Sequence, residues 1–413
     1  MTGRLSQPAV VLKGHAGTVF GATFLESPFR PGTIVTGAYL DRSSRGEIKM
    51  WLPSRGIDIS NAAAHASTST ASLEVDAKEE ITKSGILSLY QLHGTPQIAC
   101  TTFESGVHIL RAKENIMEDQ DEDDYRNNCD SSDIQRGKRK KGMVSRFSMR
   151  DEENPSVPSY SFYPVLEILG QHAPCAKVFV DKNSRILAIP SYDGAVRLYR
   201  LPDWITNSTE PERGDDDLRT STREASLQPG AVWLDDEEIE ITENGVTRTE
   251  KHMAACALTM SDDSQFMMTG GNDMQVKLWN MQSESITTRF RGHTGWVWNI
   301  KALDPFLHVA MSSSTDGFCR QWDTRSGGCV GKINVSAHGP GHVFPVTGVA
   351  LRGNAWHMAV GSMDKSVYVL DCRMMKKLYT LGQHEDRVCR AMIHEDTLMT
   401  TGWDHSVRLW DFK

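Results

Sequence analysis

The stretch RGHTGWVWNIKALDPFLHVAMSSSTDGFCRQWDTR, residues 291–325, opens on a Gly-His pair and closes just after a Trp-Asp pair. Between the two pairs lie apolar and small-residue runs of about five to seven residues, a length typical of strands and too short for stable helices. A tight Asp-Gly turn at 316–317 separates two of these runs. The stretch therefore predicts a small unit of four strands, and the same pattern recurs along the chain.

The spacing between the Gly-His and Trp-Asp pairs resembles that of a WD40 repeat, one blade of a β-propeller. In that family a histidine, a hydroxyl, a turn aspartate and a tryptophan form a hydrogen-bonded chain across the blade. Such a chain satisfies a buried imidazole and a buried indole N–H, each of which needs a partner. The resemblance implies this structural role for twelve residues: His252, Thr269, Asp273 and Trp279 in unit four; His293, Ser312, Asp316 and Trp322 in unit five; His384, Thr400, Asp404 and Trp410 in unit seven.

Seven such units follow one another, and four of them depart from the full pattern. Unit one has Thr36 and Trp51, but its turn is lengthened around Asp41, which leaves the role of Asp41 open. Unit two lacks the turn aspartate and the tryptophan, and unit three has Tyr199 in the tryptophan place. Unit six has Val360 where a hydroxyl is expected and a leucine in place of the tryptophan. All four keep strand periodicity, so we interpret them as blades of the same ring.

The two ends of the repeat array complement each other. Unit seven stops three residues after Trp410 and lacks an outer strand, whereas residues 9–13, AVVLK, form a strand with no unit of its own. Pairing the two removes the exposed edges that an open array would leave. We therefore expect an all-β fold in which residues 9–413 form a single seven-bladed WD40 propeller, closed by residues 9–13 on the last blade.

Two long charged inserts interrupt the repeats. Residues 113–160 contain an acidic run at 118–124 and a basic run at 136–141 with almost no strand pattern, and we expect them to be disordered. The basic run fits a nuclear-import signal, a weak nucleic-acid patch or a solvated charge run. Residues 202–245 form the second, acidic insert; residues 202–250 hold 14 acidic against 4 basic side chains. We expect both inserts to lie outside the propeller.

The amino-acid composition is that of a globular protein without a membrane-spanning segment. The formal net charge is −8, and 39% of the residues are hydrophobic, which is enough for a core. No apolar run reaches the ~18 residues that span a bilayer, and the N-terminus lacks an apolar signal core. We therefore expect no membrane association and an intracellular location, cytoplasmic or nuclear. The eight cysteines are scattered without a C-x-x-C pair and are interpreted as reduced core thiols.

No catalytic constellation is found in the sequence. There is no phosphate-binding G-x-x-x-x-G-K-[ST] loop, no H-E-x-x-H motif and no G-x-S-x-G with triad partners. The histidines recur at repeat spacing, as structural residues do and as an active site would not. We therefore expect neither enzymatic activity nor a metal or cofactor.

The sequence does contain residues suited to binding a partner. In WD40 proteins the residues that flank the valine of the innermost strand, and the residue before the turn aspartate, line the top face around the channel. Carried onto this sequence, these places imply an aromatic and basic set of partner-binding residues: Phe20, Lys177, Tyr192, Trp296, Trp298, Arg387 and Trp403. Such residues are enriched at binding hot spots, although aromatic rings also pack inside blades. We expect protein or peptide ligands, acidic or phosphorylated, with nucleic acid contacted only through residues 136–141.

The expected function is that of a non-catalytic scaffold or adaptor that binds protein segments on its top face and assembles a multiprotein complex. One alternative is a substrate receptor of a cullin-RING ubiquitin ligase, because Trp322, Asp323 and Arg325 resemble the W-D-x-R box by which some WD40 proteins dock on the ligase adaptor. Another alternative is a scaffold for RNA processing or ribosome assembly.

Overall fold

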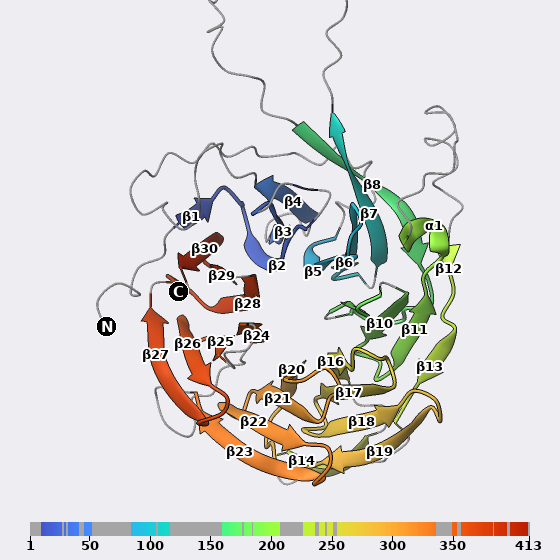
Figure 1. Ribbon diagram of the computed structural model, residues 1–413, viewed down its shortest axis with the longest axis vertical. Coiled ribbons are helices and arrows are strands. Elements are labelled where there is room, and N and C mark those ends of the chain that lie inside the picture. Colours follow the sequence, from blue (N-terminus) through green and yellow to red (C-terminus); the bar gives the residue numbers. More distant parts are fainter. Residues whose placement is uncertain are drawn as a thin grey trace, which may run out of the picture.

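The computed structural model contains a ring of seven small sheets, in which β1 (Val10–Lys13) lies beside β30 (Ser406–Asp411) (Figure 1). The expectation of an all-β, seven-bladed propeller is confirmed. The structure describes residues 10–26, 29, 32–40, 45–51, 84–104, 106–115, 159–175, 177–183, 185–206, 226–235, 239–243, 246–250, 254–335, 349–352, 357–382, 384–394 and 397–411. Within these ranges the one helix is α1 (Asp203–Thr206), and no helix is long and apolar enough to cross a membrane.

Blades one to three contain the shorter or less regular sheets. Blade one has three described strands: β2 (Thr18–Phe24), β3 (Ile34–Leu40) and β4 (Arg45–Trp51). Blade two has β5 (Ile86–Gln91), β6 (Gln97–Thr102), β7 (Val107–Asn115) and β8 (Ser159–Ile168), with β12 (Ser226–Leu227) added in parallel to β8. Blade three has β9 (Phe179–Val180), β10 (Ile186–Pro190), β11 (Val196–Arg200) and β13 (Ala231–Trp233).

Blades four to seven each have four strands, ordered from the centre of the ring outward. Blade four has β16 (Ala255–Met260), β17 (Phe266–Gly271), β18 (Val276–Asn280) and β19 (Ser285–Phe290). Blade five has β20 (Val297–Ala302), β21 (Val309–Ser314), β22 (Phe318–Asp323) and β23 (Gly328–Asn334). Blade six has β24 (Val349–Arg352), β25 (His357–Gly361), β26 (Ser366–Asp371) and β27 (Lys376–Gly382). Blade seven has β28 (Val388–His394), β29 (Thr397–Gly402), β30 (Ser406–Asp411) and β1 (Val10–Lys13).

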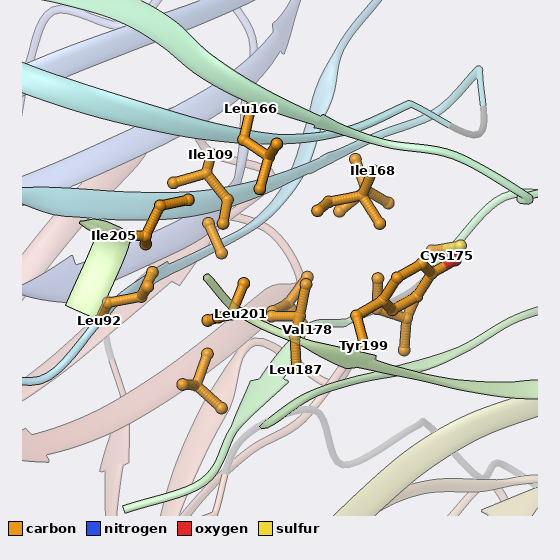
Figure 2. Close-up of a cluster of buried hydrophobic side chains, with 14 residues drawn as sticks. Leu92, Ile109, Leu166, Ile168, Cys175, Val178, Leu187, Tyr199, Leu201 and Ile205 are labelled. Atoms are coloured by element: carbon orange, nitrogen blue, oxygen red, sulfur yellow. The ribbon is translucent and has the colours of Figure 1, made fainter. Parts of the chain in front are cut away.

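The hydrophobic core lies between the blades. Seven clusters of buried side chains are present, and each joins two neighbouring blades, including blade seven to blade one. Figure 2 shows the cluster between blades two and three, where Leu166 and Ile168 of β8 face Leu187 of β10 and Tyr199 of β11, and Ile205 of α1 lies at one side. Because every blade buries both faces against neighbours, the ring folds as one unit.

The first and last strands meet in blade seven. β1 pairs antiparallel with β30 in the register Val10 to Leu409 through Lys13 to Ser406. Leu12 is buried in the cluster that also contains Val19 of blade one and Met399 of blade seven. The N-terminal strand thus covers the edge of β30 and contributes to the interface that closes the ring.

The two charged inserts differ in how much of them the structure describes. Most of residues 113–160, including the basic run, lies outside the described residues, and the ends of this range extend β7 and β8. Part of the acidic range 202–245 belongs to the ring: β13 is the outer strand of blade three, and β14 (Ile239–Glu243) begins a hairpin with β15 (Val246–Glu250). Trp233 explains why β13 is in the ring, since its buried ring stacks on Trp279 of blade four at 5.6 Å.

Candidate functional site

Blade five brings His293, Ser312, Asp316 and Trp322 together in a buried chain. The Nδ1 of His293 lies 2.8 Å from Asp316 Oδ2 and its Nε2 lies 2.7 Å from Ser312 Oγ, which also accepts the Trp322 Nε1–H at 2.7 Å. Burial lowers the pKa of His293 more than its hydrogen bond to Asp316 raises it, so the imidazole is neutral. The protons then have one consistent order: the indole donates to the hydroxyl, the hydroxyl to Nε2, and Nδ1–H to the carboxylate.

Blades seven and four contain related chains. In blade seven, His384 Nδ1 lies 2.9 Å from Asp404, and Thr400 Oγ1 lies 2.8 Å from His384 Nε2 and 2.9 Å from Trp410 Nε1. In blade four, Trp279 donates to Thr269 Oγ1 at 2.8 Å. Lys277 forms an ion pair there with Asp273, and His252 lies outside the described residues.

Blade one uses a carboxylate that the repeat spacing does not indicate. His15 Nδ1 lies 2.8 Å from Glu47 Oε2, and Thr36 Oγ1 contacts both His15 Nε2, at 2.6 Å, and Trp51 Nε1, at 2.7 Å. Glu47 lies in β4, four residues before Trp51, whereas the turn aspartates precede their tryptophans by six. Burial raises the pKa of Glu47, but hydrogen bonds from His15 and Lys49 outweigh it and lower the pKa to about 2. Asp41 lies outside the described residues.

One backbone hydrogen bond repeats at the same end of four blades and defines what we call the top face. In each case the N–H of the residue before the turn aspartate donates to a carbonyl in the loop that precedes the innermost strand. The pairs are Tyr192 to Pro174 (3.1 Å), Asn272 to Ala254 (3.1 Å), Thr315 to Trp296 (2.9 Å) and Trp403 to Arg387 (2.8 Å). The turn and the loop therefore lie side by side at the top of each blade.

A β-bulge near the start of the innermost strand directs further side chains to this region. The residues at the bulge are Phe20, Leu87, Cys256, Trp298 and Cys389. Because a bulge breaks the alternation of a strand, it re-aims its side chain. Val19 and Val297, which precede two of the bulges, are fully buried, whereas Phe20 and Trp298 are only partly buried.

Two aromatic groups occupy the top face. The first, the Arg387 cluster, comprises Phe20, Phe103, Arg387 and Trp403: the Arg387 guanidinium carbon lies 4.9 Å from the Trp403 ring centroid, and the Phe20 ring lies 6.1 Å from Trp403 and 5.4 Å from Phe103. The second, the tryptophan pair, comprises Trp296 and Trp298, stacked at 5.7 Å. Trp403 is 37% exposed and Trp296 39% exposed. Blade six separates the two groups (Figure 1).

The remaining two residues of the expected binding set, Lys177 and Tyr192, come from blade three. Lys177 Nζ donates to the carbonyl of Trp298 at 2.8 Å, which connects it to the tryptophan pair. Burial lowers the pKa of Lys177 to about 7. Tyr192 is partly buried beside the thiols of Cys175 and Cys256, and burial raises the pKa of its hydroxyl.

The Trp322, Asp323 and Arg325 set lies at the opposite end of blade five. β22 runs from the Asp316 turn at the top to Asp323, so the Arg325 side chain is at the bottom of the blade. Trp322 is fully buried in the core, whereas Arg325 is 65% exposed and holds Asp323 through Nε at 3.1 Å and Nη2 at 2.8 Å. The exposed part of this set is therefore an internally paired arginine.

Sequence reasoning missed three features of the top face and the channel. Phe103 joins the Arg387 cluster from the β6–β7 turn of a blade with no tryptophan or turn aspartate to mark it. Cys256 takes the bulge position in blade four, a place that only the strand register identifies. Lys301 and Arg390 lie on innermost strands near the channel, but no motif marks them. Within the described ranges, no group of three His, Cys, Asp or Glu side chains is placed to hold a metal ion.

Comparisons with known proteins agree with this geometry. The profile of the family described as "WD domain, G-beta repeat" matches residues 246–280, 284–323 and 375–411. The chain is 29% identical over 159 residues to the guanine nucleotide-binding protein subunit beta of Solanum tuberosum, covering 37% of this chain and 42% of that protein. It is 22% identical over 230 residues to cell division control protein 4 of Saccharomyces cerevisiae, covering 40% of this chain and 29% of that protein.

A third similar protein is the pre-mRNA-processing factor 19 of Bos taurus, 26% identical over 156 residues, which cover 37% of this chain and 29% of that protein. The match spans less than half the length of each of these relatives. The three matched segments cover the three inner strands of blades four, five and seven, the blades that the repeat spacing marks most completely. Taken with the closed ring of seven blades, they show that the chain contains WD40 repeats at three positions and is similar to WD-repeat proteins.

Proposed function

We propose that this chain is a non-catalytic scaffold whose top face binds an acidic or phosphorylated segment of another protein. The observation that carries the proposal is the position of Arg387, an exposed guanidinium held over the exposed Trp403 ring at 4.9 Å. A guanidinium presents a planar fork of donors that matches carboxylate and phosphate oxygens. In the described part of the chain it has no carboxylate partner.

The surroundings of Arg387 support a peptide as the ligand. Phe20 and Trp403 provide apolar area next to the charge, and the tryptophan pair offers a second apolar contact beyond blade six. Aromatic and arginine side chains of this kind provide much of the binding energy at protein interfaces. An extended segment that places an acidic group on Arg387 and apolar side chains on both aromatic groups would use the whole surface.

Binding measurements with substituted proteins test the proposal. Tagged wild-type protein would be purified from cells with its partners, and the affinity of the recovered partner would be measured against purified variants. Arg387→Ala and Trp403→Ala should each weaken binding roughly thirtyfold, on the order of 2 kcal/mol, if they are hot-spot residues. Arg325→Ala is the matched control, because it removes an exposed arginine from the other end of the ring.

The same set of proteins separates the alternatives. Loss of binding with Arg387→Ala and full binding with Arg325→Ala supports a top-face scaffold. Binding that depends on Arg325 and co-purifies a cullin-RING adaptor supports the ubiquitin-ligase receptor instead. Folded top-face variants with wild-type affinity for every recovered partner would contradict the proposal.

A further inference from the structure

The centre of the ring contains two contacts that cross it. Lys177, which precedes β9 in blade three, donates from Nζ to the Trp298 carbonyl in blade five at 2.8 Å, passing blade four. Arg390 of β28 in blade seven donates from Nη1 to Ser88 Oγ in β5 of blade two at 3.2 Å, passing blade one. In a closed ring, blades that are not neighbours face each other only across the central channel. Both side chains therefore lie in this channel.

A third cation belongs to the same region. Lys301 lies in β20, three residues after Trp298, and the positive charge of Arg390 contributes to lowering the pKa of both Lys301 and Lys177. Arg390 is thus close enough to repel each of the two lysines. The Lys301 side chain is exposed to water, yet desolvation by the surrounding protein lowers its pKa. Lys301 therefore lies where other parts of the protein surround it while water still reaches its side chain.

No carboxylate neutralises this group in the described residues. Lys177 and Arg390 are bound to a carbonyl and a hydroxyl, which are neutral acceptors. Asp262, the acid whose charge acts on Lys301, is bound to the exposed Lys182 at 2.8 Å. Tyr90, whose charge would act on Arg390, is neutral because burial raises its pKa to about 12. Confined cations without counterions are costly, and a bound anion offsets that cost.

We propose that the central channel binds a small anion with two or more phosphate groups between Lys177, Lys301 and Arg390. Three cationic donors require a ligand with several negative charges and many acceptor oxygens, which linked phosphates provide. The closed ring admits a ligand only through the ends of the channel, and this favours a compact anion over a long chain. Lys177 borders the tryptophan pair of the peptide surface through the Trp298 carbonyl, whereas Arg387 and Trp403 belong to the top face alone, so Lys301→Met and Arg387→Ala test the two sites independently.

Calorimetric titration of the full chain with inorganic pyrophosphate, in phosphate-free buffer at low ionic strength, tests this site. We expect binding of one anion per chain, and we expect Lys301→Met to weaken it at least tenfold. Lys301 is suited to the test because its side chain is exposed and makes no hydrogen bond within the described structure, so the variant should fold. Lys376→Met removes the same charge from an exposed position in β27, the outermost strand of blade six, and should leave the affinity unchanged.

Citrate serves as the carboxylate counterpart of pyrophosphate. Weak citrate binding and tight pyrophosphate binding support a phosphate site, whereas equal affinities would overturn the assignment to phosphates. The absence of heat with wild-type protein, or equal losses in Lys301→Met and Lys376→Met, would overturn the site itself. Circular dichroism and the melting temperature of each variant establish that a loss of binding is not a loss of fold.

Discussion

Thr400 and Thr401 are adjacent buried residues of β29 with opposite hydrogen-bonding roles. Thr400 Oγ1 contacts both His384 Nε2 and Trp410 Nε1, whereas Thr401 Oγ1 is buried with no hydrogen-bond partner in the described structure. Replacing either with valine exchanges a hydroxyl for a methyl group of similar size. The pair therefore separates the contribution of the hydrogen-bonded chain from that of side-chain volume.

The expected magnitudes follow from the partners left behind. Thr400→Val leaves the His384 Nε2 and the Trp410 indole N–H buried without a hydrogen-bond partner. Each buried unsatisfied group costs about 1–3 kcal/mol. Their sum, discounted for local relaxation, is about 2–4 kcal/mol of the free energy of unfolding. Thr401→Val takes no hydrogen-bond partner from any other group and removes a buried unsatisfied hydroxyl. The free energy of unfolding should therefore stay the same or rise by up to ~1 kcal/mol.

Urea unfolding followed by tryptophan fluorescence and by far-UV circular dichroism measures the difference. The midpoints of the two variants should move apart, with similar slopes, since neither changes the surface exposed on unfolding. If Thr400→Val and Thr401→Val differ by less than ~0.5 kcal/mol, the chain of hydrogen bonds contributes little to stability and the reasoning is wrong.

Three further predictions concern ring closure, a strained turn and the channel. Deletion of residues 1–13 removes β1 and should lower the melting temperature sharply or prevent folding; a truncated protein as stable as the full chain would exclude closure through β1. Met274 has φ +62° in the blade-four turn, a strained conformation for a residue other than glycine, so Met274→Gly should raise the free energy of unfolding in urea by up to ~1 kcal/mol. Asn272→Gly is the control, because Asn272 has no positive φ and the same change should not stabilise the protein there. Relative to Lys177→Arg, which stays charged, the pyrophosphate affinity of the wild type should fall about tenfold from pH 6 to 8 as Lys177, with a pKa of about 7, loses its proton beside the still-charged Arg390 and the neutral Cys256 thiol. The ionisation of pyrophosphate affects both proteins alike, so parallel profiles would contradict the prediction.

The sequence predicts the repeats best where local pattern and tertiary role coincide. In blades four, five and seven the Asp turn, the strand periodicity and the tryptophan all fall at fixed spacing, and each serves the same blade. The repeat spacing does not predict Glu47 as the partner of His15, because Glu47 lies inside β4 rather than in the turn. Residues 231–233 are not recognised as a strand because three apolar residues do not stand out from a strongly acidic range. Trp233 is buried only through the packing of blade three against blade four, in a cluster that includes Trp279.

The channel is harder still to predict from the sequence. Lys177 and Trp298 are 121 positions apart, and Arg390 and Ser88 are 302 apart, so no local period relates them. Their contacts depend on closure of the ring, which places non-neighbouring blades across the axis. A lysine or arginine on an innermost strand is therefore indistinguishable from a surface charge until the number of blades and their register are known.

The hydrogen-bonded chains connect the stability of the blades to the geometry of the top face. Asp404 accepts the Glu385 N–H at 3.0 Å as well as His384, and the adjacent Trp403 N–H is bound to the Arg387 carbonyl. The loop that carries Arg387 is thus fixed at both its histidine and its turn. A side chain held in place before binding loses less entropy when a ligand arrives, and more of its contact energy appears as affinity. The chain that stabilises blade seven therefore also preorganises the proposed binding residues.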